Sequence, residues 1–124
     1  MTDSPDTRVT MTVPSAPEFA STLRVMVACL GADAGCSLDE IDDLRLALTE
    51  VFSLFDPAAG GRISVAFDVV AGGLEVEVAH EDGRAPEEPD LIAHTLLTSV
   101  VDSFLVDGCR VVIRKSPAEL TRSS

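Results

Sequence analysis

The chain has 124 residues, is 46% hydrophobic, and carries 21 acidic against 9 basic residues, for a formal net charge of −12. This length and composition are typical of one domain that buries its own core. The negative charge disfavours nucleic acid as a partner, because it repels phosphates, and favours a basic protein surface. Neither a membrane-spanning apolar run nor a signal-peptide pattern occurs, so we expect a cytoplasmic protein without membrane contacts.

The three cysteines, Cys29, Cys36 and Cys109, are odd in number and lack Cys-x-x-Cys spacing. This pattern favours reduced structural thiols over a disulfide framework or a zinc site. We expect one domain over residues 1–124, with flexible tails at 1–6 and 117–124 and no metal.

The first predicted element is a strand over residues 8–13, where apolar and polar side chains alternate. Pro14 ends it. Ser15 and Glu18 have the spacing of a capping box, so a helix is predicted from there to about Leu30, where a glycine follows.

The strongest helix signal runs from Ser37 to Phe55. Ser37 and Glu40 form a second capping box, in which each side chain accepts a hydrogen bond from the other residue's backbone amide. Apolar residues recur at helical spacing and predict a broad face that packs on a sheet; they are Ile41, Leu44, Leu48, Val51, Phe52 and Phe55.

Two alternating segments, 63–69 and 74–78, predict a hairpin with its turn at 71–73. A polar loop over 80–90 follows, and Asp90 can cap the next helix. An apolar helical stripe then runs to about Val106 and precedes a last strand at 109–114. The expected fold is an α/β two-layer sandwich, with a mostly antiparallel sheet and helices on one face.

Few residues are candidates for chemistry. The sequence has no phosphate-binding loop, no Gly-x-Ser-x-Gly and no His-Glu-x-x-His, and its two histidines stand alone. Glu50, near the edge of the apolar stripe, and the loop after residue 80 remain. A solvated glutamate on a helix flank is the ordinary alternative for Glu50.

Two segments carry a family resemblance: FASTLRVMV at 19–27 and DLRLALTE at 43–50. With the order of elements, they make the chain similar to the bacterial anti-sigma factor and serine kinase family of the histidine-kinase-like (GHKL, Bergerat-fold) ATPases. The resemblance implies the histidine-kinase-like ATPase fold. It also implies a partner-binding role for Arg24 on the first helix, and the place of the general base for Glu50.

The chain departs from the family pattern around the nucleotide. The magnesium-binding asparagine is replaced by Leu54, which offers no oxygen ligand. The adenine loop Asp-x-Gly-x-Gly is reduced to Glu81, Asp82 and Gly83, and the glycine-rich lid is absent at 91–94. Because phosphoryl transfer depends on positioning and charge stabilisation, these losses imply a vestigial Glu50. They imply no cofactor, or only weak binding of ATP or ADP.

The resemblance therefore implies an anti-sigma factor that sequesters an alternative RNA polymerase sigma factor and is released by an anti-anti-sigma (STAS-type) antagonist. Two alternatives stay open: an active ATP-dependent serine kinase that phosphorylates its antagonist, and a scaffold with an unrelated partner. A homodimer is neither indicated nor excluded. For Arg24 the alternative is a surface arginine without a role.

Overall fold

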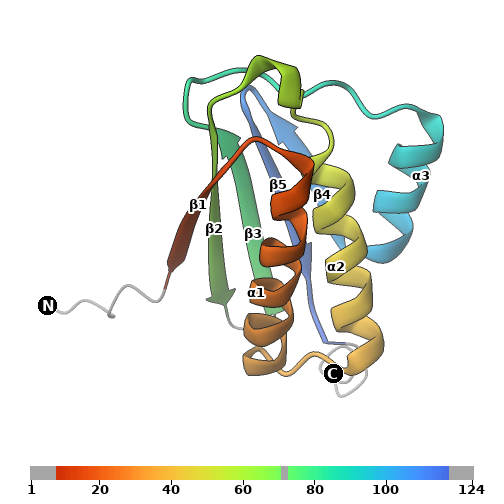
Figure 1. The fold of residues 1–124 in the computed structure, drawn as a ribbon. Coiled ribbons are helices and arrows are strands. Elements are labelled where there is room, and N and C mark those ends of the chain that lie inside the picture. Colours follow the sequence, from red (N-terminus) through yellow and green to blue (C-terminus); the bar gives the residue numbers. More distant parts are fainter. Residues whose placement is uncertain (1–7, 71–72, 118–124) are drawn as a thin grey trace, which may run out of the picture.

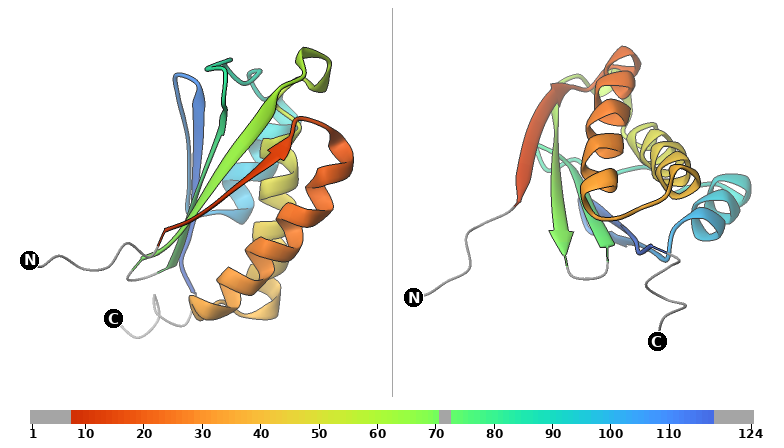
Figure 2. Two further views of the ribbon diagram at one scale, coloured as in Figure 1. Left: turned by 60° about the vertical axis from the view of Figure 1, so that its left-hand side comes forward. Right: turned by 90° about the horizontal axis from the view of Figure 1, so that it is seen from below.

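A computed structural model describes residues 8–70 and 73–117. Within them, five antiparallel strands form one sheet in the order β1-β2-β3-β5-β4 (Figure 1). The α-helices cover one face of this sheet and leave the other face open (Figure 2). The predicted α/β two-layer sandwich is thereby confirmed. The elements are β1 (Val9–Pro14), a 3-10 turn η1 (Pro17–Phe19), α1 (Ala20–Asp33), α2 (Leu38–Phe52), a 3-10 turn η2 (Pro57–Ala59), β2 (Arg62–Val70), β3 (Gly73–His80), α3 (Leu91–Val100), β4 (Ser103–Asp107) and β5 (Arg110–Lys115).

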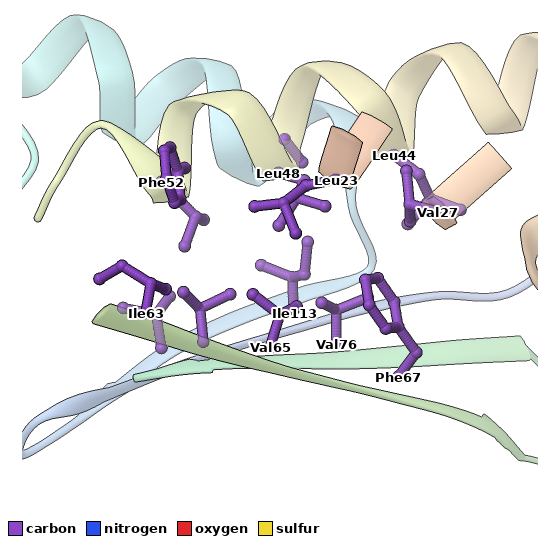
Figure 3. Close-up of a cluster of buried hydrophobic side chains, with 14 of the residues drawn as sticks. Leu23, Val27, Leu44, Leu48, Phe52, Ile63, Val65, Phe67, Val76 and Ile113 are labelled. Carbon is purple, nitrogen blue, oxygen red and sulfur yellow. The ribbon is translucent and has the colours of Figure 1, made fainter. Parts of the chain in front are cut away.

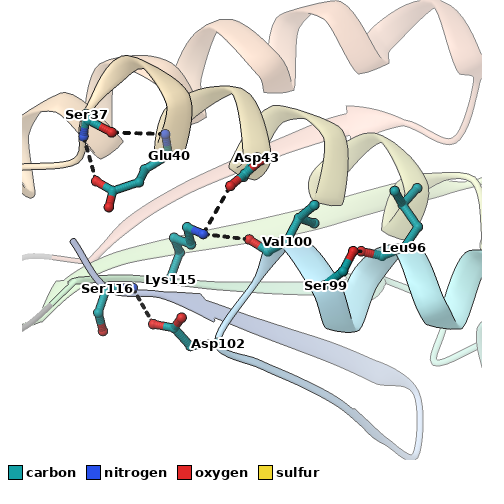
Figure 4. A network of polar contacts seen from close by, with 9 residues as sticks. All are labelled: Ser37, Glu40, Asp43, Leu96, Ser99, Val100, Asp102, Lys115 and Ser116. Atoms are coloured by element: carbon teal, nitrogen blue, oxygen red, sulfur yellow. Dashed lines mark hydrogen bonds and ion pairs between the residues drawn. The ribbon is translucent and has the colours of Figure 1, made fainter. Parts of the chain in front are cut away.

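Helix α2 begins with the predicted capping box. The Glu40 amide donates to Ser37 Oγ at 3.2 Å, and the Ser37 amide donates to Glu40 Oε1 at 2.7 Å (Figure 4). The predicted apolar face is buried, so that assignment is confirmed as well. The helix ends at Phe52 rather than Phe55, although Phe55 stays buried in the turn that follows.

The core lies between the helices and the inner face of the sheet. In Figure 3, Leu48 of α2 and Leu23 of α1 point toward Val65 and Ile113 on the strands. These side chains and Phe67 of β2 are at most 1% exposed. Burial of such apolar surface is the main favourable term in folding.

The start of α1 differs from the prediction. No capping box forms between Ser15 and Glu18; the buried Ser15 instead donates its amide to the Gly61 carbonyl at 2.9 Å. A 3-10 turn that starts at Pro17 intervenes, and α1 begins only at Ala20, without a side-chain cap. The chain leaving β1 is held by the backbone of a distant loop, which local sequence spacing does not reveal.

Gly31 does not stop α1, which continues to Asp33. A Cβ at this buried glycine would lie 3.3 Å from Ile41 Cγ1 and 3.3 Å from Leu44 Cδ1 of α2. The lack of a side chain at Gly31 therefore lets α1 and α2 approach closely, and it does not end α1.

The prediction of a helix to Val106 is wrong. Helix α3, capped by Asp90 as expected, ends at Val100, and the next residue is extended with φ −124° and ψ 157°. Residues 103–107 form the edge strand β4, which pairs with β5 across a tight turn. Apolar side chains packed on the core explain the change, because Val101 is 6% exposed and Phe104 is half-buried.

Lys115 at the end of β5 joins the helices to the sheet. Its Nζ donates to Asp43 Oδ2 of α2 at 3.2 Å and to the Val100 carbonyl at the end of α3 at 2.8 Å (Figure 4). A cation at this point satisfies a carbonyl that the helix leaves without a partner.

The hairpin of β2 and β3 is confirmed on both sides of its turn, of which residues 71–72 lie outside the described residues. The predicted tails also fall largely outside them, and Pro117 is buried. Among the described residues, no helix combines the length and apolar character needed to cross a bilayer.

Candidate functional site

The candidate base Glu50 lies on α2 and is half-buried. Within residues 8–70 and 73–117, its carboxylate accepts no hydrogen bond and forms no ion pair. One turn later, Leu54 is only 7% exposed, and its carbonyl accepts a hydrogen bond from the Glu87 amide at 2.8 Å. The loop before α3 is thus tied to the backbone that follows α2, beside a buried apolar side chain.

The residues of the candidate nucleotide loop, Glu81, Asp82 and Gly83, are exposed and form a tight turn after β3. The Gly83 amide donates to the His80 carbonyl at 2.9 Å, and the Glu81 amide donates to the Arg62 carbonyl at 2.9 Å. Gly83 has φ +78°, which favours glycine.

The imidazole of His80 forms hydrogen bonds with this turn and with the loop at residues 60–61. It is 3% exposed, its Nε2 lies 2.7 Å from the Gly60 carbonyl oxygen, and its Nδ1 accepts from the Asp82 amide at 3.1 Å. With the Asp82 amide donating to Nδ1, Nε2 is the ring nitrogen that can donate to the Gly60 carbonyl. His80 therefore links the 60–61 loop to the 81–83 turn as a structural residue.

A polar hollow of about 440 Å³ lies next to this turn. Its lining residues are Phe55, Asp56, Ala59, His80, Arg84, Ala85 and Glu87. Neither Glu50 nor residues 81–83 line it, so the structure does not bring the candidate base and the candidate nucleotide loop together in this hollow.

Arg24 lies in a different place. It is half-buried and lines a mostly apolar groove of about 390 Å³ between the start of α1 and the end of α2. The other lining residues are Ser15, Ala16, Pro17, Ala20, Thr49, Phe52, Ser53, Phe55 and Pro57. Sequence reasoning placed Arg24 on the outside of α1, and it missed the groove because residues of α2 and of both flanking turns build it.

Arg24 forms no ion pair with any residue in the described part of the chain, and no carboxylate lines the groove. A guanidinium in such a setting can bind the carboxylate of another protein by donating two parallel hydrogen bonds. The apolar walls can take up an adjacent apolar side chain.

Among the residues that the structure describes, no group of three or more His, Cys, Asp or Glu side chains could hold a metal ion. Burial, followed by the charge of Glu40, raises the pKa of the Cys36 thiol. A thiol that stays protonated at neutral pH is a poor nucleophile.

Comparison with known proteins gives partial likenesses. No family model matches the chain. In an alignment of 78 residues, it is 32% identical to the serine-protein kinase RsbW of Bacillus subtilis (strain 168); the match covers 59% of this chain and 49% of the relative. The protein of the same name from Listeria innocua serovar 6a is 29% identical in an alignment of 77 residues, with coverage of 58% of this chain and 49% of the relative. That from Bacillus licheniformis is 30% identical in an alignment of 78 residues, with coverage of 59% of this chain and 49% of the relative.

The chain thus spans about half the length of the curated relatives that it matches. Over this shared part, the predicted resemblance to the bacterial anti-sigma factor and serine kinase family is confirmed.

Proposed function

We propose that this chain is an anti-sigma factor, which binds and sequesters an alternative RNA polymerase sigma factor and is released by a STAS-type antagonist. The observation that carries this proposal is Arg24, a cation without an ion-pair partner among the described residues, set in an apolar groove. The likeness to serine-protein kinases over 59% of the chain supports it. The net charge of −12 suits a client with basic DNA-binding surfaces.

The groove offers two kinds of interaction at once. A partner carboxylate gains charge-assisted hydrogen bonds from Arg24, which are stronger beside apolar walls than in open water. An apolar partner side chain next to it gains contact with Phe52 and Phe55. Arginine with a nearby apolar pocket is a frequent composition of interface hot spots.

We further propose that nucleotide-dependent chemistry is lost, leaving at most weak ATP or ADP binding. Three features support this: a buried Leu54 in place of an oxygen ligand, a loop bound to its carbonyl, and an exposed turn at residues 81–83. The second candidate, an active serine kinase, is favoured by the names of the similar proteins and by the carboxylate of Glu50.

Arg24→Glu is expected to weaken binding of the client sigma factor by about 30-fold or more, equivalent to about 2 kcal/mol. The client is first identified by pull-down from native extract, and affinity is then measured by calorimetry. The melting temperature stays nearly unchanged, because no described residue forms an ion pair with Arg24.

The matched control is Arg62→Glu, a charge reversal at an exposed arginine on β2, outside the groove. Equal losses of affinity at both positions indicate diffuse electrostatics rather than a binding groove. Unchanged affinity in Arg24→Glu removes this residue from the interface.

Calorimetry with ATP and magnesium is expected to show weak or no binding. Leu54→Asn alone is not expected to restore phosphate transfer to a STAS-type antagonist, because the glycine-rich lid remains absent. Circular dichroism of this variant is the check that it is folded. Submicromolar affinity with a magnesium requirement contradicts the loss of the nucleotide site, and phosphorylation of the antagonist by the unmodified chain establishes the kinase alternative.

A further inference from the structure

The groove between the start of α1 and the end of α2 contains a second hydrogen-bond donor besides Arg24. Ser15 lines it and is only 7% exposed. Its amide donates to the Gly61 carbonyl, but within residues 8–70 and 73–117 its hydroxyl forms no hydrogen bond. No polar side-chain atom in those ranges is both fully buried and unbonded, so this hydroxyl remains accessible. The groove thus offers a neutral donor and a cationic donor.

The other hydroxyls of the groove already use their hydrogens inside α2. Thr49 Oγ1 donates to the Arg45 carbonyl at 2.8 Å, and Ser53 Oγ donates to the Glu50 carbonyl at 2.7 Å. The lining residues include no carboxylate that could pair with Arg24. A ligand that suits the groove therefore carries negative charge and accepts hydrogen bonds from Ser15 and Arg24.

The remaining walls of the groove are apolar and limit the kind of anion further. Their residues are Ala16, Pro17, Ala20, Phe52, Phe55 and Pro57. A fully hydrophilic anion such as phosphate loses hydration against these walls without compensation. A carboxylate attached to an apolar body satisfies the donors and also removes apolar surface from water. The volume of about 390 Å³ is at the small end of the range for ligand pockets, so we expect a small molecule.

We propose that this groove binds a small apolar carboxylic acid in its ionised form. The carboxylate accepts hydrogen bonds from the Arg24 guanidinium and the Ser15 hydroxyl, and the apolar body lies against Phe52 and Phe55. The bound molecule takes the position that the proposed function gives to a carboxylate of the partner, so it competes with the client sigma factor. The competition rests on the proposed function, whereas the binding itself does not.

The charge distribution makes binding at this groove easy to recognise. The net charge of −12 repels anions from the surface as a whole, so binding of an organic anion elsewhere is disfavoured. Helices α1 and α2 contain one basic residue each, Arg24 and Arg45. Arg45 is exposed and pairs with Asp42 at 3.6 Å, outside the groove. Arg45 is therefore a matched control for Arg24.

Phenylacetate is a suitable probe, because it combines the charge with an apolar body. Phenylacetamide keeps the shape without the charge, and acetate keeps the charge without the apolar body. Titration of the isotope-labelled chain, followed by NMR, is expected to show saturable shifts at the amides of Ala16, Ala20 and Thr49, with a Kd of about 1 mM or tighter. The amide and acetate are expected to bind at least about tenfold more weakly. Absence of saturable shifts, or equal binding of phenylacetate and phenylacetamide, overturns the proposal.

Arg24→Gln is expected to weaken phenylacetate binding at least about tenfold, and Ser15→Ala by about threefold. Ser15→Ala keeps the amide that donates to Gly61, and the NMR spectrum of each variant reports whether it is folded. Arg45→Gln removes the same charge from α2 and is expected to leave binding unchanged. Equal losses in Arg24→Gln and Arg45→Gln reject the site, and unchanged binding in Ser15→Ala contradicts the arrangement with two donors.

A capped dipeptide of glutamate and leucine tests the other source of the same chemistry, a carboxylate that belongs to a protein. Binding of this peptide without binding of phenylacetate assigns the groove to a protein partner and overturns this inference. At about ten times its Kd, phenylacetate is expected to weaken the apparent affinity for the client sigma factor about tenfold. Unchanged client affinity at that concentration contradicts the competition and the Arg24 interface of the proposed function. No phenylacetate binding, together with loss of client binding in Arg24→Glu, overturns this inference alone.

Discussion

Leu48→Ala is expected to lower the free energy of unfolding by roughly 2–5 kcal/mol. The Leu48 side chain is 1% exposed and points from α2 into the core between helices and sheet (Figure 3). Its truncation removes buried apolar contacts and leaves a cavity, because the surrounding strands and α1 can relax only in part. Urea or guanidinium unfolding, followed by circular dichroism, measures the change.

Leu46→Ala provides the matched control, because Leu46 is on the same helix but is 41% exposed. Its truncation is expected to change stability by no more than about 0.5 kcal/mol. If both variants unfold at the same denaturant concentration as the parent, the packing of α2 on the sheet is not the principal source of stability.

Gly61→Ala is expected to destabilise the fold by roughly 2–4 kcal/mol, from backbone strain and overpacking together. Gly61 has φ +79°, and a Cβ there would lie 2.8 Å from His80 Nε2. The imidazole cannot easily move aside, because it is buried and bonded to Gly60 and Asp82. Thermal and chemical unfolding measure the loss.

Gly83→Ala separates the two contributions. Gly83 has nearly the same φ, +78°, but nothing lies within 4 Å of the position of its Cβ. Its substitution is therefore expected to cost only the backbone term, about 1–2 kcal/mol. Equal losses in the two variants would show that overpacking of a Cβ at residue 61 against His80 adds no measurable cost.

The elements that the sequence predicted correctly have local causes. The capping box of Ser37 and Glu40 and the cap at Asp90 each act within three residues, and the structure contains both. The apolar spacing of α2 and the alternation in β2 and β3 reflect one face buried against one partner layer. Such signals are complete within a short window of sequence.

The errors arose where distant contacts decide the conformation. Residues 101–106 fit helical spacing, yet packing of Val101 and Phe104 and pairing with β5 make this segment a turn and a strand. Ser15 has a capping partner in sequence, yet the carbonyl of Gly61 takes its amide. Local propensity is a weak prior against contacts of this kind.

The predictions for the candidate site show the same difference between local signals and distant contacts. The family resemblance directed attention to Arg24, Glu50 and residues 81–83 by motif position alone. The groove around Arg24 and the hollow beside His80 combine segments far apart in sequence, so no motif could indicate them. The role of Arg24 is a proposal that Arg24→Glu tests.

The order of elements around β1 has a consequence for synthesis of the chain. Strands β2 and β3, and likewise β4 and β5, are neighbours in sequence, and hairpins of this kind form within microseconds. Strand β1 pairs with β2 across the whole of α1 and α2, at a larger cost in loop closure. Strand β1 must therefore wait for β2 during synthesis, because the two helices lie between them in sequence. Until it docks, β2 presents an open edge beside Ile63, Val65 and Phe67, and nascent chains are then most exposed to aggregation.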